Sequence, residues 1–502
     1  MGERLRARDL SFLATETATA PRHNATIEIF EPGASGFDYD RLLELIADRM
    51  SFVPRYRQRL VEVPGHLAAP VWVDDKHFDL AYHVRRSALP RPGSDEQLLE
   101  LVGRIVSRPL DRSRPLWEMY FVEGLSGDRV AVLSKSHQAL VDGVHTVDLG
   151  QLLLDVTPEP KAFEPDEWYP RGAPSTAGVV VDAIRDTLTD RTTLVDTASM
   201  ATAAALRSAQ QARRRARKVA RGLTGRRTRR SAIFGPLSQQ RRVLTLETSL
   251  ADYRTVRAAH GGTINDVILA TIAGGMRSYL MTRTESMSGI RQVRTLVPVS
   301  VIDEELEATS LGSQIAAHFV DLPIAEPSPI VRLHQVSYSF QAHKETGRSV
   351  AANRLAGIAG FAPTTFHAIG SRVASEELNR GYDLCVTNVP GPQTPLYAAG
   401  ARMVATYPVA PLLERHPLSI AVTSYDGRVF YGITADRDLL PDIDVLGGCL
   451  IESLDELLAA STATRAPRGR TTAAKKAAAA RASVTKAVKR AAGGAEEPES
   501  DR

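Results

Sequence analysis

The chain has few cysteines and no long apolar run, and both absences exclude classes of protein. Its 502 residues contain two cysteines, Cys385 and Cys449, which cannot form a disulfide framework or a cysteine-rich zinc site. No stretch approaches the ~18 uninterrupted apolar residues of a membrane-spanning helix. The N-terminal sequence Met-Gly-Glu-Arg-Leu-Arg lacks the apolar region of a signal peptide. We therefore expect a reduced, cytoplasmic protein that contacts membranes only peripherally.

Acidic residues are missing from one long segment, and this explains the formal net charge of +4. Residues 207–246 contain 13 Lys and Arg and no Asp or Glu. The tail, residues 461–502, contains 10 Lys and Arg against 4 Asp and Glu. Without these two segments the rest of the chain carries a charge of about −15. The expected folded body is thus acidic, and any anionic partner is expected to meet the basic segments.

The length and the alternation patterns predict a two-domain protein of the α/β (α+β) class. Alternating residues predict strands at 25–30, 117–122 and 130–134, and Ser94 with Gln97 forms a capping box that starts a helix. A second block begins near Val243 and contains the hairpin 418–434, whose turn is Asp426-Gly427. A last amphipathic helix is expected at 445–458.

Composition sets the expected boundaries. We predict an N-terminal domain at 1–160, a Pro-containing then basic helical linker at 161–242, and a C-terminal domain at 243–460. The Ala/Lys/Arg-rich tail at 461–502 has no aromatic residue, cannot bury a core and is predicted to be disordered.

One segment combines residue types suited to catalysis. A predicted strand delivers His137 and Gln138, and the loop after it carries Asp142 and Gly143. Imidazole is the side chain best suited to accept a proton from a hydroxyl near neutral pH. A carboxylate nearby orients the ring or pairs with an arginine. A histidine at a strand end is, however, often only bonded to backbone, and Asp-Gly is common in turns.

Several segments in the same order resemble the bacterial wax ester synthase/diacylglycerol acyltransferase family. His137 to Gly143 is similar to its His-His-x-x-x-Asp-Gly motif. Four further segments resemble family patterns: Phe78-Asp79-Leu80 to Gly93, Pro115-Leu116-Trp117, Asn265-Asp266 within 263–270, and Asn388-Val389-Pro390-Gly391-Pro392. The resemblance runs from about Leu10 to Leu458 and leaves out the tail.

The resemblance implies a fold and a reaction. It implies two chloramphenicol-acetyltransferase-like domains packed as a pseudo-dimer with a tunnel between them. It also implies transfer of a fatty acyl group from acyl-CoA to diacylglycerol or a long-chain alcohol, giving triacylglycerol or wax ester. Acyl-CoA is then a substrate, and no cofactor or metal is expected. The supporting site residues are Gly143, Asn265 and Asp266, and the tunnel candidates are Pro115, Leu116, Trp117, Asn388, Pro390 and Gly391.

The sequence departs from the family at the second motif histidine, which is usually taken as the general base. Gln138 stands there, and an amide has no useful basicity near pH 7. Because successive strand residues point to opposite faces, His137 does not replace it without a local bend. His145 is a weaker substitute. General-base assistance contributes ~10²–10⁴-fold, so its loss predicts slowed or altered chemistry.

Structural interpretations compete with the functional ones for the supporting motifs. Asn265 and Asp266 follow Thr263, where helix capping accounts equally well for their identity. Asn388 to Pro392 also fits a rigid turn, and Trp117 is favoured as a core residue.

Three functional hypotheses stay open, as do the partners of the basic segments. The first is the acyl-CoA-dependent O-acyltransferase. The second is a catalytically weakened relative that binds lipid or an anionic membrane or lipid-droplet surface. The third is a condensation-type enzyme acting on an amine or a carrier-bound thioester. The tail also fits nucleic-acid binding through phosphate neutralisation, or a solubilising role alone.

Overall fold

The structure is a computed structural model. It describes residues 3–5, 7–33, 36–63, 69–140, 150, 153–160, 168–172, 233, 235–283, 292–300, 315–344, 373 and 381–465. Asp142, Gly143 and His145, the predicted linker helix and nearly all of the predicted tail lie outside these residues.

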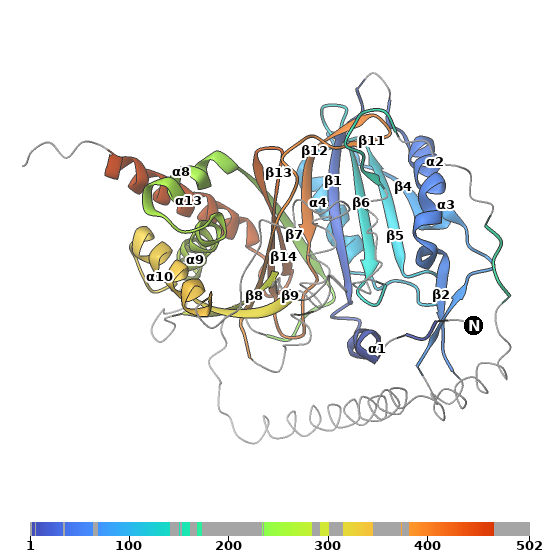
Figure 1. Cartoon of the computed structure of the whole chain (residues 1–502), viewed down its shortest axis with the longest axis horizontal. Coiled ribbons are helices and arrows are strands. Elements are labelled where there is room, and N and C mark those ends of the chain that lie inside the picture. Colours follow the sequence, from blue (N-terminus) through green and yellow to red (C-terminus); the bar gives the residue numbers. More distant parts are fainter. Residues whose placement is uncertain are drawn as a thin grey trace, which may run out of the picture.

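The first half of the chain builds most of a six-stranded mixed sheet (Figure 1). Its strands, in spatial order, are β11 (Tyr397–Ala398), β12 (Ala401–Val409), β1 (His23–Glu31), β6 (Val130–His137), β5 (Trp117–Glu123) and β4 (Val84–Ala88). Only β4 and β5 run parallel to each other. The helices of this half are α1 (Ala7–Thr15), α2 (Tyr39–Arg49), α3 (Leu80–His83) and α4 (Asp95–Val106). Two 3-10 turns, η2 (Met50–Phe52) and η3 (Pro54–Arg57), follow α2. Strands β2 (Gln58–Val61) and β3 (Val71–Asp74) form a separate two-stranded sheet.

The second half builds another six-stranded sheet. Its order is β7 (Arg241–Ser249), β14 (Arg428–Asp436), β13 (Leu418–Tyr425), β10 (Leu384–Pro390), β8 (Val293–Ser300) and β9 (Ile315–Leu322). Strand β10 is parallel to both of its neighbours. The helices α8 (Leu250–His260), α9 (Ile264–Thr282), α10 (Pro329–Lys344) and α13 (Ile443–Arg465) gather on one side of this sheet (Figure 1).

Local sequence signals explain where several elements begin and turn. The hydroxyl of Ser94 accepts from the Gln97 N–H and the Gln97 side chain accepts from the Ser94 N–H, so the predicted capping box starts α4. Asp426 and Gly427 both have positive φ, 44° and 80°, as the two-residue turn between β13 and β14 requires. The alternation predicted for 25–30, 117–122 and 130–134 is confirmed by strands β1, β5 and β6.

The second half of the chain contributes two strands to the first sheet. Strand β12 comes late in the chain, yet it pairs with β1 in antiparallel register, Ala25 opposite Val409. The predicted C-terminal unit 243–460 therefore supplies β11 and β12 to the first sheet. Each half keeps its own apolar core, and Figure 1 shows β12 between β1 and the second sheet. This strand holds the two sheets together.

Gly432 allows a close backbone approach between the two sheets. A Cβ atom at this position in β14 would lie 1.7 Å from the Pro408 carbonyl oxygen of β12, and backbone cannot yield as a flexible side chain does. We expect Gly432→Ala to lower the free energy of unfolding by about 2–3 kcal/mol, the cost of overpacking. Urea denaturation measures this. Gly448→Ala, in α13 with nothing within 4 Å of its added Cβ, is the matched control and should stabilise slightly.

The C-terminal helix is longer than predicted. Helix α13 ends at Arg465, so residues 461–465, predicted as the start of the tail, form its last turn. Ser461 is buried and donates a hydrogen bond to the Leu457 carbonyl, which satisfies its hydroxyl within the helix. Within the described residues, no helix combines the length and apolarity needed to cross a bilayer.

Candidate active site

The residues of the His137 motif lie where strand β6 ends. The β1–β6 register places His137 opposite His23, and the backbone N–H of Gln138 extends this ladder by donating to the Arg22 carbonyl at 2.8 Å. Both side chains are buried, with 1% of His137 and none of Gln138 exposed. Gln138 is the first residue of the turn after β6, but the backbone N–H groups of His137 and Gln138 still bond to opposite neighbours, Leu116 and Arg22, so the alternation of faces continues to Gln138.

One ring nitrogen of His137 is hydrogen-bonded, and the other faces a carboxylate. Its Nδ1 accepts the Ala139 N–H at 3.0 Å, so the proton of the neutral ring sits on Nε2. Nε2 lies 3.6 Å from the Oε1 atom of Glu16. Burial lowers the pKa of His137, although Glu16 opposes this shift. A ring engaged in this way fixes the turn that follows β6, and its contacts argue for positioning rather than for proton abstraction.

Glu16 ties the start of the chain to this turn. Its Oε1 accepts the Arg22 N–H at 3.0 Å, and its Oε2 accepts from Arg112 Nε at 3.1 Å. The carboxylate is 6% exposed. Burial alone would raise the pKa of Glu16, but His137, Arg112 and the Arg22 N–H together lower it far below its usual range. Glu16 therefore stays ionised and orients the motif histidine.

The buried histidines predict how stability depends on pH. Burial lowers the pKa of His23 and of His137, which lie opposite each other on β1 and β6. The unfolded chain takes up protons near pH 6.5 while the native chain does not, so acid favours unfolding. We expect each histidine to cost up to about 1.4 kcal/mol between pH 6.5 and 5.5.

The pH effect can be measured as urea midpoints at pH 7.5 and pH 5.5. His23→Gln removes one buried histidine and should flatten the dependence, whereas His77→Gln, at an exposed position, should leave it unchanged. Equal slopes in all three proteins would contradict the assignment.

The Pro115-Leu116-Trp117 segment contacts the motif directly. The Leu116 carbonyl accepts the His137 N–H at 2.9 Å, and Pro115 is buried beside it. Trp117 is fully buried, its ring stacks on His83 at 4.7 Å, and its Nε1 donates to the Tyr56 carbonyl at 2.8 Å. The Nε1 atom and the ring of Trp117 are thus both used in contacts within the fold, which fits a core residue.

The two asparagine motifs meet in the second sheet. Asn388, in β10, donates from Nδ2 to Asn265 Oδ1 at 2.9 Å across 123 residues of sequence. Asp266 forms a capping box with Thr263, its Oδ2 accepting the Thr263 N–H at 2.8 Å. Capping therefore accounts for Asp266, and Asn265 is the member of the pair that reaches another motif.

The end of the Asn388–Pro392 segment is fixed to a neighbouring hairpin. Pro390 is the last residue of β10 and lies opposite Ser424, whose hydroxyl accepts the Gly391 N–H at 3.3 Å. The Pro392 carbonyl accepts the Asp426 N–H. The candidate residues thus form two separate groups of contacts. The Pro115-Leu116-Trp117 segment contacts His137 in the first half of the molecule. Asn265 of α9 contacts Asn388, and Gly391 contacts Ser424, in the second half.

The structure adds residues that no sequence motif indicated. Glu16 and Arg22 reach the turn through the loop between α1 and β1, and Asn24 lies in β1 beside the motif strand. Nothing in their local sequence marks them, because strand pairing alone brings them to β6. Within the described residues, no group of three or more His, Cys, Asp or Glu could hold a metal ion.

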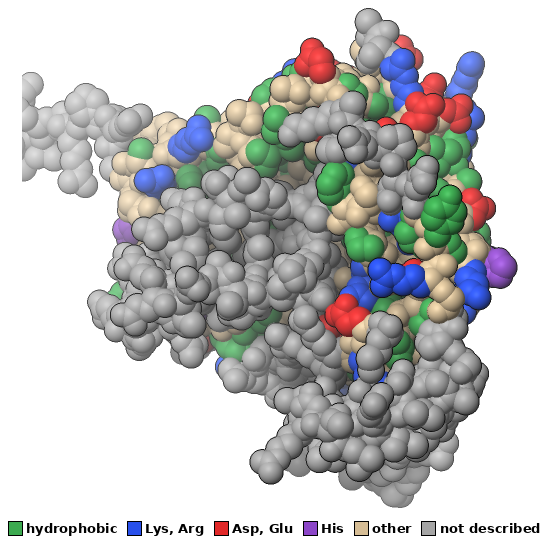
Figure 2. Space-filling model, turned by 45° about the vertical axis from the view of Figure 1, so that its right-hand side comes forward, with side chains coloured by type: hydrophobic (Ala, Val, Ile, Leu, Met, Phe, Trp, Pro, Cys, Tyr) green, Lys and Arg blue, Asp and Glu red, His purple; other side chains and the backbone are tan. Residues whose placement is uncertain are grey.

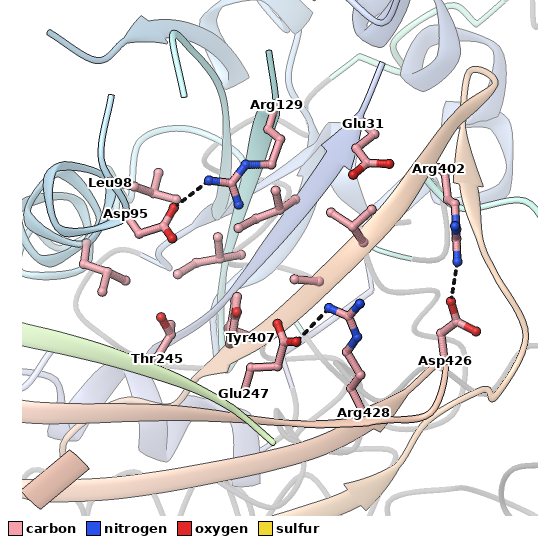
Figure 3. Close-up of a pocket in the computed structure, with 15 residues that line it drawn as sticks. Glu31, Asp95, Leu98, Arg129, Thr245, Glu247, Arg402, Tyr407, Asp426 and Arg428 are labelled. Atoms are coloured by element: carbon pink, nitrogen blue, oxygen red, sulfur yellow. Dashed lines mark hydrogen bonds and ion pairs between the residues drawn. The ribbon is translucent and has the colours of Figure 1, made fainter. Parts of the chain in front are cut away.

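A cavity of about 310 Å³ lies between the sheets, away from the motif (Figure 3). Three ion pairs border it: Arg129 with Asp95 at 3.0 Å, Arg402 with Asp426 at 2.8 Å, and Arg428 with Glu247 at 2.7 Å. On β1 it is lined by Ile27, Ile29 and Glu31, which alternate with Thr26 and Glu28. It therefore opens on the face of the sheet opposite to Gln138.

Comparison with known proteins places this geometry in a family. Residues 5–268 match the wax ester synthase/diacylglycerol acyltransferase catalytic domain, and residues 311–458 match the C-terminal domain of the same family. The chain belongs to the wax ester synthase/diacylglycerol acyltransferase family. The predicted resemblance is confirmed over both halves.

Relatives and solved structures agree with this placement. A probable diacylglycerol O-acyltransferase of Mycobacterium tuberculosis is 32% identical over 433 residues, covering 86% of this chain and 91% of the relative. Another from the same organism is 43% identical over 263 residues, covering 52% of this chain and 97% of the relative. The wax ester synthase/diacylglycerol acyltransferase of Marinobacter aquaeolei VT8 superposes with a TM-score of 0.64 at 25% identity, covering 91% and 100% of the two chains.

A more distant match concerns the fold alone. The first condensation domain of the CDA synthetase has a TM-score of 0.51 at 14% identity, covering 91% of this chain and 96% of that one. Together with the family structure, it confirms the predicted α/β class and the arrangement of two similar halves. The segment that resembles the family motif begins where β6 ends, with His137 as the last residue of the strand and Gln138 after it.

Proposed function

We propose that the protein transfers a fatty acyl group from acyl-CoA to diacylglycerol or a long-chain alcohol, forming triacylglycerol or wax ester. The observation that carries the proposal is the family match over both halves, which includes the strand that ends in His137 and the turn residue Gln138 after it. The same match favours an enzyme over a protein that only binds lipid.

The residues present suggest how the reaction proceeds. The acceptor oxygen attacks the thioester carbonyl, the carbon–sulfur bond breaks, and the acceptor proton ends on the sulfur of coenzyme A. Gln138 hydrogen-bonds and orients the acceptor hydroxyl but does not take its proton. Glu16 and His137 fix the turn that presents Gln138. Turnover should accordingly be slow, since general-base assistance of ~10²–10⁴-fold is missing.

Transfer of labelled palmitate from palmitoyl-CoA to diolein and to hexadecanol tests the proposal. We expect labelled triacylglycerol or ester to form in proportion to purified protein, and formation to fall in Gln138→Ala. No product with either acceptor would overturn the proposed function. If Gln138→Ala forms product as fast as the wild type, acyl transfer does not depend on Gln138, and the reaction takes place elsewhere than at the end of β6.

We also propose that the basic segments 207–246 and 461–502 bring the enzyme to an anionic lipid surface, where its apolar substrates reside. Each basic residue near such a surface contributes about 1 kcal/mol. On the face drawn in Figure 2, acidic and basic side chains of the described residues lie interspersed.

Flotation with vesicles tests the surface proposal. The full chain should float with vesicles containing phosphatidylserine at low salt and not with neutral vesicles, and charge-neutral replacement of the basic residues should abolish flotation. Equal flotation after that replacement would overturn it. If instead the tail retains DNA while vesicles do not float, nucleic acid would be its partner.

A further inference from the structure

One face of the first sheet carries a row of polar side chains beside Gln138. Residues directly opposite in antiparallel strands share a face, and the register pairs Asn24 with Ser136 and Thr26 with Ser134. Gln138, the first residue of the turn after β6, lies two residues beyond Ser136, and its backbone N–H continues the ladder to Arg22, which places it on the same face. We call Asn24, Thr26, Ser134 and Ser136 the polar row. It runs from the motif position along β1 and β6.

The polar row is buried where a core face would ordinarily be apolar. Asn24 and Ser136 are 8% exposed, and Thr26 and Ser134 are 5% exposed. On the next strand the same face carries Trp117 opposite Ser136 and Met119 opposite Ser134, both fully buried. The row is thus a strip of hydrogen-bonding groups bordered by apolar side chains, which is the composition of a ligand site rather than of a core.

The side chain of Asn24 has no partner of its own. Among the described residues, neither its Nδ2 nor its Oδ1 has a hydrogen-bond partner, although both atoms are inaccessible to solvent. Leaving a buried polar group unpaired costs about 1–3 kcal/mol. The opposite face of the same strands differs, since Lys135 there donates to the carbonyls of Ile105 and Arg108. An unpaired amide beside the motif is best explained by a bound group.

We propose that the polar row binds the ester-bearing part of diacylglycerol and makes the enzyme selective for diacylglycerol over long-chain alcohols, an inference that rests on the proposed function. Diacylglycerol carries two ester carbonyls besides its hydroxyl, and carbonyls need donors. The Asn24 amide and the hydroxyls of Ser134 and Ser136 supply them within reach of Gln138. A long-chain alcohol has no carbonyl, so it would leave these buried groups unpaired, and such a site rejects the poorer ligand strongly.

The ratio of kcat/KM for diolein to that for hexadecanol tests the assignment. The wild-type ratio should exceed one, and Asn24→Leu, similar in size but unable to hydrogen-bond, should lower it about 10-fold, the loss of roughly one hydrogen bond. Ser136→Ala is a milder second variant that should lower the ratio in the same direction. Thr434→Val is the matched control: its hydroxyl is also buried and has no partner among the described residues, but it lies in β14 of the second sheet.

The outcomes separate this inference from the proposed function. Activity with an unchanged ratio in both Asn24→Leu and Ser136→Ala would overturn the selectivity assignment and leave the acyltransferase standing. A ratio that falls equally in Thr434→Val would also overturn it, because the effect would then be general. No transfer to either acceptor by the wild-type protein would overturn the proposed function and this inference with it.

Discussion

Replacing Gln138 with histidine is expected to raise kcat for acyl transfer by about 10²-fold. The position lies at the end of β6, its backbone is anchored to Arg22, and the turn after it is fixed by His137. A histidine of similar size placed there restores a group that takes the acceptor proton as the thioester is attacked. If the site at Gln138 is the one we propose, this single side chain supplies the base that the amide lacks.

The pH profile of this variant distinguishes a base from a better fit. In Gln138→His, kcat should rise with pH through the pKa of the new imidazole, because only the neutral ring accepts a proton. The kcat of the wild-type enzyme should not show this rise with pH, because the amide of Gln138 does not titrate there. Gln138→Asn is the control, since it keeps an amide. If kcat of Gln138→His equals that of the wild type at every pH, proton abstraction at this position does not limit the reaction.

Removing the Glu16 side chain is expected to have the largest effect on stability. Glu16→Ala leaves the part-buried Arg22 N–H without its acceptor and removes the carboxylate that accepts from Arg112 and faces His137 Nε2 at 3.6 Å. Hydrogen bonds to charged groups contribute about 1.5–3 kcal/mol each. We therefore expect the free energy of unfolding to fall by about 2–5 kcal/mol in urea denaturation. Residual turnover should fall as well, because the turn that presents Gln138 loses its anchor.

Two further variants separate the effect of the negative charge of Glu16 from the effect of its size and shape. Glu16→Gln keeps an acceptor oxygen but loses the pairing with Arg112, so its stability should lie between those of the wild type and Glu16→Ala. Glu44→Gln, at an exposed position of α2, should change nothing measurable. If kcat falls in Glu16→Ala while KM stays constant, Glu16 acts by positioning. If Glu16→Ala has the same free energy of unfolding as the wild type, the contacts of Glu16 with Arg22, Arg112 and His137 do not stabilise the fold.

Much of the fold follows from local sequence. The strands around residues 25–30, 117–122 and 130–134, the Ser94 capping box and the Asp426-Gly427 hairpin are all signalled within a few residues of where they occur. Alternation, capping and turn chemistry act over such short ranges. The contribution of β12 to the first sheet was not predicted, because sequence carries no local signal of which distant strand completes an edge.

The site was predicted in part. The family motif at His137 and Gln138 and the Pro115-Leu116-Trp117 segment were found from sequence, and the structure joins them through the Leu116 carbonyl. The contact of Asn265 with Asn388 links two motifs that sequence could name but not place together. Asp142 and Gly143, outside the described residues, stay predictions.

The sequence by itself determined the family and the polar and apolar pattern of each strand, since these depend on residue identity and spacing. The loss of a base at Gln138 stays a prediction from the sequence. Only the tertiary structure decided that His137 is engaged by Glu16 and that Asn24 and Ser136 share the face of Gln138. Those facts depend on strand register, and a shift of one residue would turn every side chain to the other face. Register is fixed by the packing of the whole sheet, which no single segment encodes.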